Sequence, residues 1–201
     1  SDVYKRQQVS RAVGKSVSLQ QLNGASREEF VSALRPLFNN ETWPLELAWE
    51  SRPFGDVNEL RAAIQVAVLT ADDSRRAALI HDYPAMDELL LADADEAATI
   101  SADRGSLGLT DLDDVQTERI TELSAAYRER FDMPFVAYLD TNDTVDRVID
   151  AGVRRLANSP EQEYRTALGE IVEIANDRFD ILLADANPVR SSWDRKFTEV
   201  D

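Results

Sequence analysis

The sequence has no cysteine and only one histidine, His81, among its 201 residues. Without cysteine the chain cannot form a disulfide, a thiolate metal site or a thiol nucleophile. A single histidine leaves no basis for a Ser–His–Asp or Cys–His nucleophile arrangement. We therefore expect no metal site and no need for an oxidising compartment, and we predict a cytoplasmic protein.

Long apolar runs and an excess of positive charge are also absent. No run approaches the roughly 20 residues that span a bilayer, and the N-terminus lacks the basic, apolar and small-residue order of a signal peptide. The 38 acidic residues exceed the 22 basic ones, and the formal charge of −16 repels phosphate backbones and anionic lipids. The composition therefore predicts no nucleic-acid partner and no membrane partner. The acidity is consistent with adaptation to high salt, a hypothesis that stability measurements in molar salt test.

Helix start signals are frequent in this sequence. Ser26 and Asp56 each begin a capping-box pattern that precedes apolar residues at helical spacing. Ser159 is followed by a first-turn proline and by a glutamine three residues on, so we expect a long helix from there to about Leu183.

Further apolar stripes of helical period cover residues 111–131, which include Val115, and residues 145–156, which include Val153. Only residues 134–140 (PFVAYLD) are strand-like, and one short extended segment cannot form a sheet. The sequence therefore predicts an all-α fold, a single-domain compact helical bundle.

We place the helical domain at residues 17–185 and expect a flanking segment on each side. Residues 1–7 (SDVYKRQ) resemble the translated remnant of a sequencing adapter, so residues 1–16 are expected to be non-native or disordered. Residues 186–201 form a polar tail that we expect to lie outside the core.

Arg178 occupies an unusual place in the last helix. It follows Leu168, Ile171 and Ala175 at steps of three and four residues, so its guanidinium lies on the stripe that otherwise faces the core. A buried unpaired charge costs several kcal/mol, so this arginine needs an anionic partner. That partner is either a structural carboxylate or a ligand, unless the end of the side chain reaches water. His81 likewise has two interpretations, a surface histidine or an acid/base catalyst.

Three blocks of the sequence carry a resemblance to a known family. They are residues 17–38 (VSLQQLNGASREEFVSALRPLF), residues 122–139 (ELSAAYRERFDMPFVAYL) and residues 154–179 (RRLANSPEQEYRTALGEIVEIANDRF). In order and spacing they are similar to the 2-oxo-4-hydroxy-4-carboxy-5-ureidoimidazoline (OHCU) decarboxylases, the enzymes that complete the conversion of urate to S-allantoin. Ser124 stands where that family's pattern has asparagine.

The resemblance implies an all-helical, cofactor-free carboxy-lyase that acts on a small anionic ureidoimidazoline-type substrate and forms a homodimer. In the family, a histidine before a proline and the glutamate of a Ser-x-x-Glu-Gln segment assist loss of carbon dioxide and reprotonation. An arginine late in the chain holds the substrate's anionic group. Decarboxylation leaves electron density that must be delocalised and then protonated on one face, so a proton donor has to be held in position.

The family's site maps onto this sequence with three substitutions. Arg178 falls on the family's arginine, and Tyr83, which precedes a proline, stands at the histidine position. The Ser-x-x-Glu-Gln segment aligns with Ser101, Asp103 and Arg104, so that aspartate replaces glutamate and arginine replaces glutamine.

These substitutions change what the site can do. A tyrosine side chain, whose ordinary pKa is about 10, can donate a proton at neutral pH but is a poor base. Asp103 holds its carboxylate back by one methylene, and Arg104 could bind an anion or pair with that carboxylate and lower its pKa. The predicted catalytic residues are Tyr83, Asp103 and His81, and the predicted substrate-binding residues are Arg178, Arg104, Ser101, Phe135 and Val136.

The resemblance thus predicts decarboxylation of OHCU to S-allantoin, or of a related ureido acid. The alternative is a diverged member of the family that binds anions without catalysis or acts on an altered substrate. A purely structural interaction module is a third hypothesis.

Overall fold

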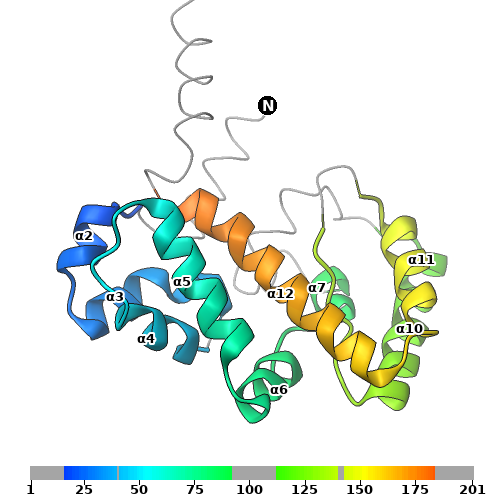
Figure 1. Ribbon diagram of the computed structural model, residues 1–201. Coiled ribbons are helices and arrows are strands. Elements are labelled where there is room, and N and C mark those ends of the chain that lie inside the picture. The colour runs from blue at the N-terminus through cyan, green and yellow to red at the C-terminus, as the bar shows by residue number, and fades with distance from the viewer. Residues whose placement is uncertain (1–15, 40, 92–111, 140–142, 184–201) are drawn as a thin grey trace, which may run out of the picture.

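The computed structural model describes residues 16–39, 41–91, 112–139 and 143–183. Helices make up the regular structure of these residues, and the prediction of an all-α fold is confirmed (Figure 1). In chain order they are α2 (Leu19–Gly24), α3 (Arg27–Leu34), the 3₁₀ helix η1 (Arg35–Phe38), α4 (Trp43–Trp49), α5 (Val57–Thr70), α6 (Asp73–His81), α7 (Met86–Leu91), α10 (Asp114–Phe131), α11 (Val145–Arg155) and α12 (Pro160–Leu182).

The helix starts follow the capping signals in the sequence. Ser26 and Ser159 both form complete capping boxes, in which the serine hydroxyl accepts the N3 amide and the N3 side chain accepts the amide of the serine. Asp56 caps α5 by accepting the Glu59 amide at 2.8 Å. The reciprocal half of that predicted box is wrong, because the Glu59 carboxylate accepts from the Gly55 amide at 2.6 Å instead.

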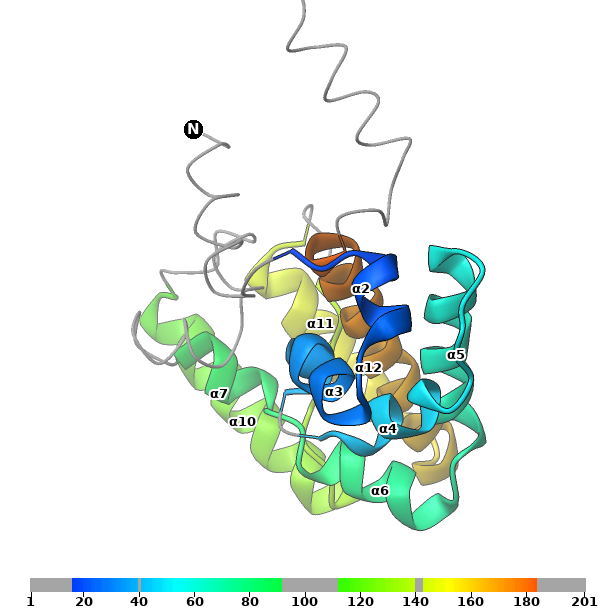
Figure 2. The same cartoon turned by 90° about the vertical axis from the view of Figure 1, so that its left-hand side faces the viewer.

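α12 lies between two groups of helices, with α2 to α5 on one side and α10 and α11 on the other (Figure 1). The larger hydrophobic cluster joins the first group and α6 to α12, and includes Phe30, Phe38 and Phe179. The smaller cluster joins α7, α10 and α11, and in it the Tyr127 ring packs against the rings of Phe131 and Phe135. Figure 2 shows α7 beside α10 at the far end from α5. Burial of each large apolar side chain in these clusters stabilises the folded state by about 1.5–3 kcal/mol.

Gly152 allows α11 to approach α10 closely. A Cβ atom at this position would lie 2.5 Å from Leu123 Cδ2 and 2.8 Å from Phe135 Cζ, and both side chains are buried. Glycine is therefore required here for its small size. The apolar stripe predicted for α11 includes Val153, but this residue is 52% exposed. The stripe predicted for α10 includes Val115, which is 64% exposed, so both predictions of a core-facing position are wrong.

Contacts between the first motif block and residues 49–54 hold the N-terminal helices together. The Asn23 side chain makes two hydrogen bonds with the Phe54 backbone, donating to its carbonyl at 2.9 Å and accepting its amide at 2.8 Å. The Arg52 guanidinium stacks 4.1 Å above the Trp49 ring and donates to the carbonyls of Asn23 and Ala25. Asn23 and Arg52 therefore have structural roles, and their contacts explain these positions of the sequence without a role in a functional site.

The start and end of the described domain meet. Val17 pairs with Leu183 in an isolated parallel bridge, and the Val17 amide donates to the Leu182 carbonyl at 2.9 Å. Residues 134–139 of the strand-like segment belong to no helix or strand, and residue 140 lies outside the described residues. In the part of the chain that the structure describes, no helix is both long and apolar enough to cross a membrane.

Candidate functional site

Arg178 is buried near the C-terminal end of α12, as its position on the apolar stripe predicts. Only 5% of the residue is exposed. Its Nη1 donates to the Pro36 carbonyl at 3.0 Å and to Asn39 Oδ1 at 2.9 Å. Both acceptors belong to η1 or the residue after it, and both are neutral. These two bonds therefore fix the orientation of the guanidinium without adding a negative charge beside it.

Asn39 has a backbone that few residues other than glycine adopt, with φ of 56° and ψ of −108°. Its Nδ2 is buried and has no hydrogen-bond acceptor in the described part of the chain. An unsatisfied buried donor costs about 1–3 kcal/mol, so its position calls for an explanation.

Tyr83 and His81, the two predicted proton donors, lie in different surroundings. Tyr83 follows α6, is 6% exposed and packs in the larger hydrophobic cluster. The His81 side chain is 68% exposed, and its Nδ1 lies 3.3 Å from Asp82 Oδ1. The structure therefore places the tyrosine inside the protein and the histidine at its surface.

His81 faces an open groove of about 400 Å³ between α6, the end of α10 and the start of α12. The charged side chains that line it besides His81 are Asp82 and Asp132. Two carboxylates repel an anionic substrate, so this groove is a poor place to bind one. The remaining lining residues are Ala77, Ala78, Ile80, Met133 and Tyr164.

Phe135 and Val136 are both buried, in the non-helical segment of residues 133–139 that follows α10. Three elements bind the backbone of this segment. The Met86 amide at the start of α7 donates to the Phe135 carbonyl at 2.8 Å, and Arg155 Nη1 from α11 donates to the Val136 carbonyl at 2.7 Å. The Tyr138 amide donates to the carboxylate of Glu170 on α12 at 2.8 Å. Met86 lies three residues after Tyr83, so its bond to Phe135 also attaches the link between α6 and α7 to this segment.

Glu163 is fully buried and forms the centre of a polar cluster that the sequence analysis did not single out. Its carboxylate accepts hydrogen bonds from the Tyr127 hydroxyl, from Arg155 Nε at 2.6 Å and from Asn158 Nδ2 at 2.9 Å. The Arg155 side chain is 12% exposed and also forms an ion pair with this carboxylate. The cluster joins α10, α11 and α12, and Arg155 connects it directly to the Val136 backbone.

The environment of these groups shifts two pKa values upward. Burial, followed by the hydrogen bond to Glu163, raises the pKa of Tyr127 far above its ordinary value, although the Arg155 charge acts in the opposite direction. Burial also raises the pKa of Glu170, and the hydrogen bond from the Tyr138 amide partly offsets this effect. The Tyr127 hydroxyl therefore remains a donor at all ordinary pH values.

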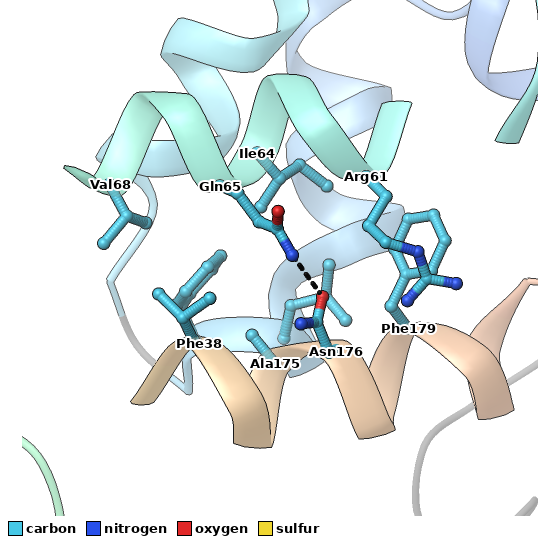
Figure 3. A pocket seen from close by; sticks show the side chains of 10 residues that line it. Phe38, Arg61, Ile64, Gln65, Val68, Ala175, Asn176 and Phe179 are labelled. Carbon is cyan, nitrogen blue, oxygen red and sulfur yellow. Dashed lines mark hydrogen bonds between the residues drawn. The ribbon is translucent and has the colours of Figure 1, made fainter. Parts of the chain in front are cut away.

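A second pocket lies between η1, α5 and α12 on the side that Figure 3 shows. Gln65 Nε2 reaches across it to Asn176 Oδ1 at 3.0 Å, and the Arg61 guanidinium stacks 4.5 Å from the Phe179 ring. Its volume of about 10 Å³ is close to that of one water probe, so it is too small for a ureidoimidazoline ring.

The predicted residues Ser101, Asp103 and Arg104 lie outside the described residues. Of the predicted site residues, the structure describes Arg178, Tyr83, His81, Phe135 and Val136, and all of these except His81 are buried. Within the described ranges, no group of three or more histidine, aspartate or glutamate side chains is arranged to hold a metal ion.

Three residues of the Glu163 cluster had a signal in the sequence that was not used. Glu163 lies four residues before Ala167 and so falls on the stripe that leads to Arg178. Arg155 and Asn158 belong to the third motif block. Asn39 had no such signal, because its conformation and its contact with α12 arise only in the folded chain.

Comparisons with known proteins identify the family of the chain. A family model described as OHCU decarboxylase matches residues 23–180. A Haloferax volcanii protein named 2-oxo-4-hydroxy-4-carboxy-5-ureidoimidazoline decarboxylase is 37% identical over 164 residues, which are 81% of this chain and 94% of that protein. A Mus musculus protein of the same name is 33% identical over 176 residues, covering 84% of this chain and 95% of that protein.

A crystal structure of (S)-allantoin synthase superimposes with a TM-score of 0.64 at 22% identity. The match covers 83% of this chain but 54% of that one, and at this identity it supports the fold alone. The family model covers most of the helical domain and includes Arg178, so the chain belongs to the OHCU decarboxylase family.

Proposed function

We propose that this protein decarboxylates 2-oxo-4-hydroxy-4-carboxy-5-ureidoimidazoline to S-allantoin in urate degradation, without a cofactor. The observation that carries the proposal is the buried Arg178, oriented by the Pro36 carbonyl and the Asn39 side chain, at the position where the family has its anion-binding arginine. The names of the Haloferax and mouse relatives supply the substrate. A Bacillus sp. protein named uric acid degradation bifunctional protein is 28% identical over 159 residues, which are 78% of this chain and 30% of that protein. Its name supports the same pathway.

The reaction requires the protein to bind and orient the substrate and to deliver a proton to one face of it. When the bond between the ring carbon and the carboxylate breaks, carbon dioxide leaves and the electron pair stays on the substrate, where the ring delocalises it. A proton must then be added on one face to give a single enantiomer. In our proposal Arg178 binds and orients the anionic group, and a neighbouring side chain delivers the proton.

We assign the proton donor to Tyr83 in preference to His81. A phenol is protonated at neutral pH and can donate from a site that excludes water, and Tyr83 is buried. His81 is exposed on a groove that carries two carboxylates. Asp103 assists the proton transfer, and Arg104, Ser101, Phe135 and Val136 complete the substrate site.

The Arg178→Ala variant tests the anion-binding role. We expect it to abolish enzyme-dependent formation of S-allantoin, while the variant remains folded. Arg61→Ala is the matched control, because Arg61 also packs on α12, beside Phe179, but pairs with the half-buried Asp180. Equal activity of the Arg178→Ala variant and wild type would refute the assignment.

Tyr83→Phe and His81→Ala together test the proton donor. We expect the first change to remove turnover and the second to leave it. The reverse result would transfer the role to His81. Substrate binding without release of carbon dioxide by wild-type protein would instead support the non-catalytic alternative.

The expected homodimer is a further part of this proposal. Light scattering of the purified protein tests it, and a monomeric mass at the concentration of the assay would contradict it.

A further inference from the structure

Asn39 keeps a backbone conformation that a glycine would adopt more easily. Its φ of 56° and ψ of −108° lie outside the regions that residues with a Cβ favour. Such conformations persist where the surrounding structure enforces them, and they are concentrated at binding and catalytic sites. A side chain retained at such a position points to a use for that side chain.

The two polar atoms of the Asn39 side chain have different environments. Oδ1 accepts a hydrogen bond from Arg178 Nη1 at 2.9 Å, and this bond determines which end of the amide is oxygen, because a guanidinium only donates. Nδ2 is then buried beside the same arginine, with no acceptor in the part of the chain that the structure describes. Buried donors are nearly always bonded, so this one indicates a ligand oxygen.

We propose that Asn39 is a specificity residue of the substrate site, in which Oδ1 holds Arg178 and Nδ2 donates to an oxygen of the anionic group bound there. The inference rests on the proposed function, and it adds a second, neutral donor to the anion site. A carboxylate offers two oxygens in one plane, so one can pair with the guanidinium and the other with the amide. The ligand class is therefore a carboxylate attached to a ureido or imidazoline group.

The charge of the two side chains explains why an amide suits this position. An aspartate would still accept from Arg178, but it would neutralise the guanidinium and offer no donor. A glycine would relax the backbone but remove both the acceptor and the donor. Asn39 alone among these three supports the arginine and contacts the anion.

Asn39→Gly and Asn39→Asp test the inference. Glycine tolerates the positive φ, which offsets part of the cost of losing the acceptor for Arg178, whereas Asn39→Asp retains that acceptor. Asn176→Ala is the matched control, since Asn176 is a carboxamide on α12 that bonds to Gln65 rather than to Arg178. The readouts are KM and kcat with OHCU, thermal stability, and calorimetric binding of hydantoic acid, a stable ureido carboxylate.

We expect both Asn39 variants to raise KM and to weaken hydantoic acid binding by about ten-fold or more, because each loses a hydrogen bond to a charged group. The change in kcat should be smaller than the change in KM, and Asn176→Ala should match wild type. Asn39→Asp is the discriminating variant, because it keeps the acceptor for Arg178: if Asn39 only supported Arg178, this variant would keep the KM of wild type. A raised KM for Asn39→Asp at unaltered stability supports the inference.

Two results would overturn the inference in distinguishable ways. If wild type forms S-allantoin and both Asn39 variants keep KM within two-fold of it, Asn39 does not contact the substrate, and the proposed function stands. If wild type neither turns over OHCU nor binds hydantoic acid, the proposed function and the role of Asn39 fail together.

Discussion

Replacing Arg155 with alanine removes the only formal positive charge that contacts the Glu163 carboxylate among the described residues. Glu163 is completely buried, and Arg155 supplies both an ion pair and a hydrogen bond from Nε to it. After the substitution the carboxylate keeps its bonds from Tyr127 and Asn158 but has no charge partner in the described cluster. The same change also removes the donor to the Val136 carbonyl.

The magnitude follows from the general cost of breaking a buried ion pair. Removing one partner costs about 3–5 kcal/mol, because the other charge remains buried and uncompensated. The lost bond to Val136 adds about 0.5–1.5 kcal/mol. Because domains of this size are stable by only about 5–15 kcal/mol, we expect Arg155→Ala to lose a large fraction of its free energy of unfolding.

Urea denaturation followed by circular dichroism measures this loss as a change in midpoint at constant slope. Arg165→Ala is the control, because Arg165 forms an exposed pair with Glu161 on the same helix, and we expect a change below about 0.5 kcal/mol. A loss of less than about 1 kcal/mol in Arg155→Ala would refute the assignment of this cluster as a buried, charge-paired junction.

Three other predictions concern packing, pH and salt. Gly152→Ala should lose about 1–3 kcal/mol in urea denaturation, because its Cβ would collide with the buried Leu123 and Phe135; an unchanged midpoint would contradict the close approach of α11 to α10. Because burial raises the pKa of Glu170, the protonated side chain is favoured in the folded state. This stabilisation is fully present below the ordinary pKa of 4.5 and is lost as the pH rises through the folded pKa. Glu170→Gln keeps an acceptor for the Tyr138 amide, so it should be more stable than wild type at neutral pH, and this difference should vanish in acid; a constant difference in stability across pH would refute the effect of burial. If the formal charge of −16 reflects salt adaptation, the melting temperature should rise between low and molar potassium chloride, and a flat or falling profile would argue against that adaptation.

Features with a local cause were predictable from the sequence. The capping boxes at Ser26 and Ser159 depend on residues three positions apart, so the sequence alone contains their geometry. The burial of Arg178 followed from its spacing along one helix. The expected box at Asp56 was wrong in its second half because Glu59 had a competing donor, the Gly55 amide, which lies just as close in sequence.

Features that depend on contacts between distant segments were not predictable in this way. Glu163 reads as a favourable acidic residue in the first turn of a helix, and only the meeting with Arg155 from another helix accounts for its burial. Val153 is apolar and lies on a helical stripe, but the face that contacts α10 is narrower than that stripe. The role of Asn39 requires η1 to pack on α12, which no local pattern indicates.

Family resemblance supplied the remaining part of the site. It selected Arg178 as a ligand-binding residue, where spacing alone favoured a structural ion pair or a side chain that reaches water. It also directed attention to Tyr83, whose burial the structure then showed. The assignment of Tyr83 as proton donor stays a prediction, as do the roles of Ser101, Asp103 and Arg104.

The most direct test of the account supplies the wild-type protein with freshly generated OHCU and follows the product. Urate, urate oxidase and hydroxyisourate hydrolase generate the substrate, and circular dichroism distinguishes S-allantoin from the racemate that forms spontaneously. We predict a rapid, enzyme-dependent appearance of S-allantoin that Arg178→Ala abolishes and Arg61→Ala retains. Racemic allantoin at the rate of the buffer control, from protein shown to be folded in low and in molar salt, would contradict the central claim.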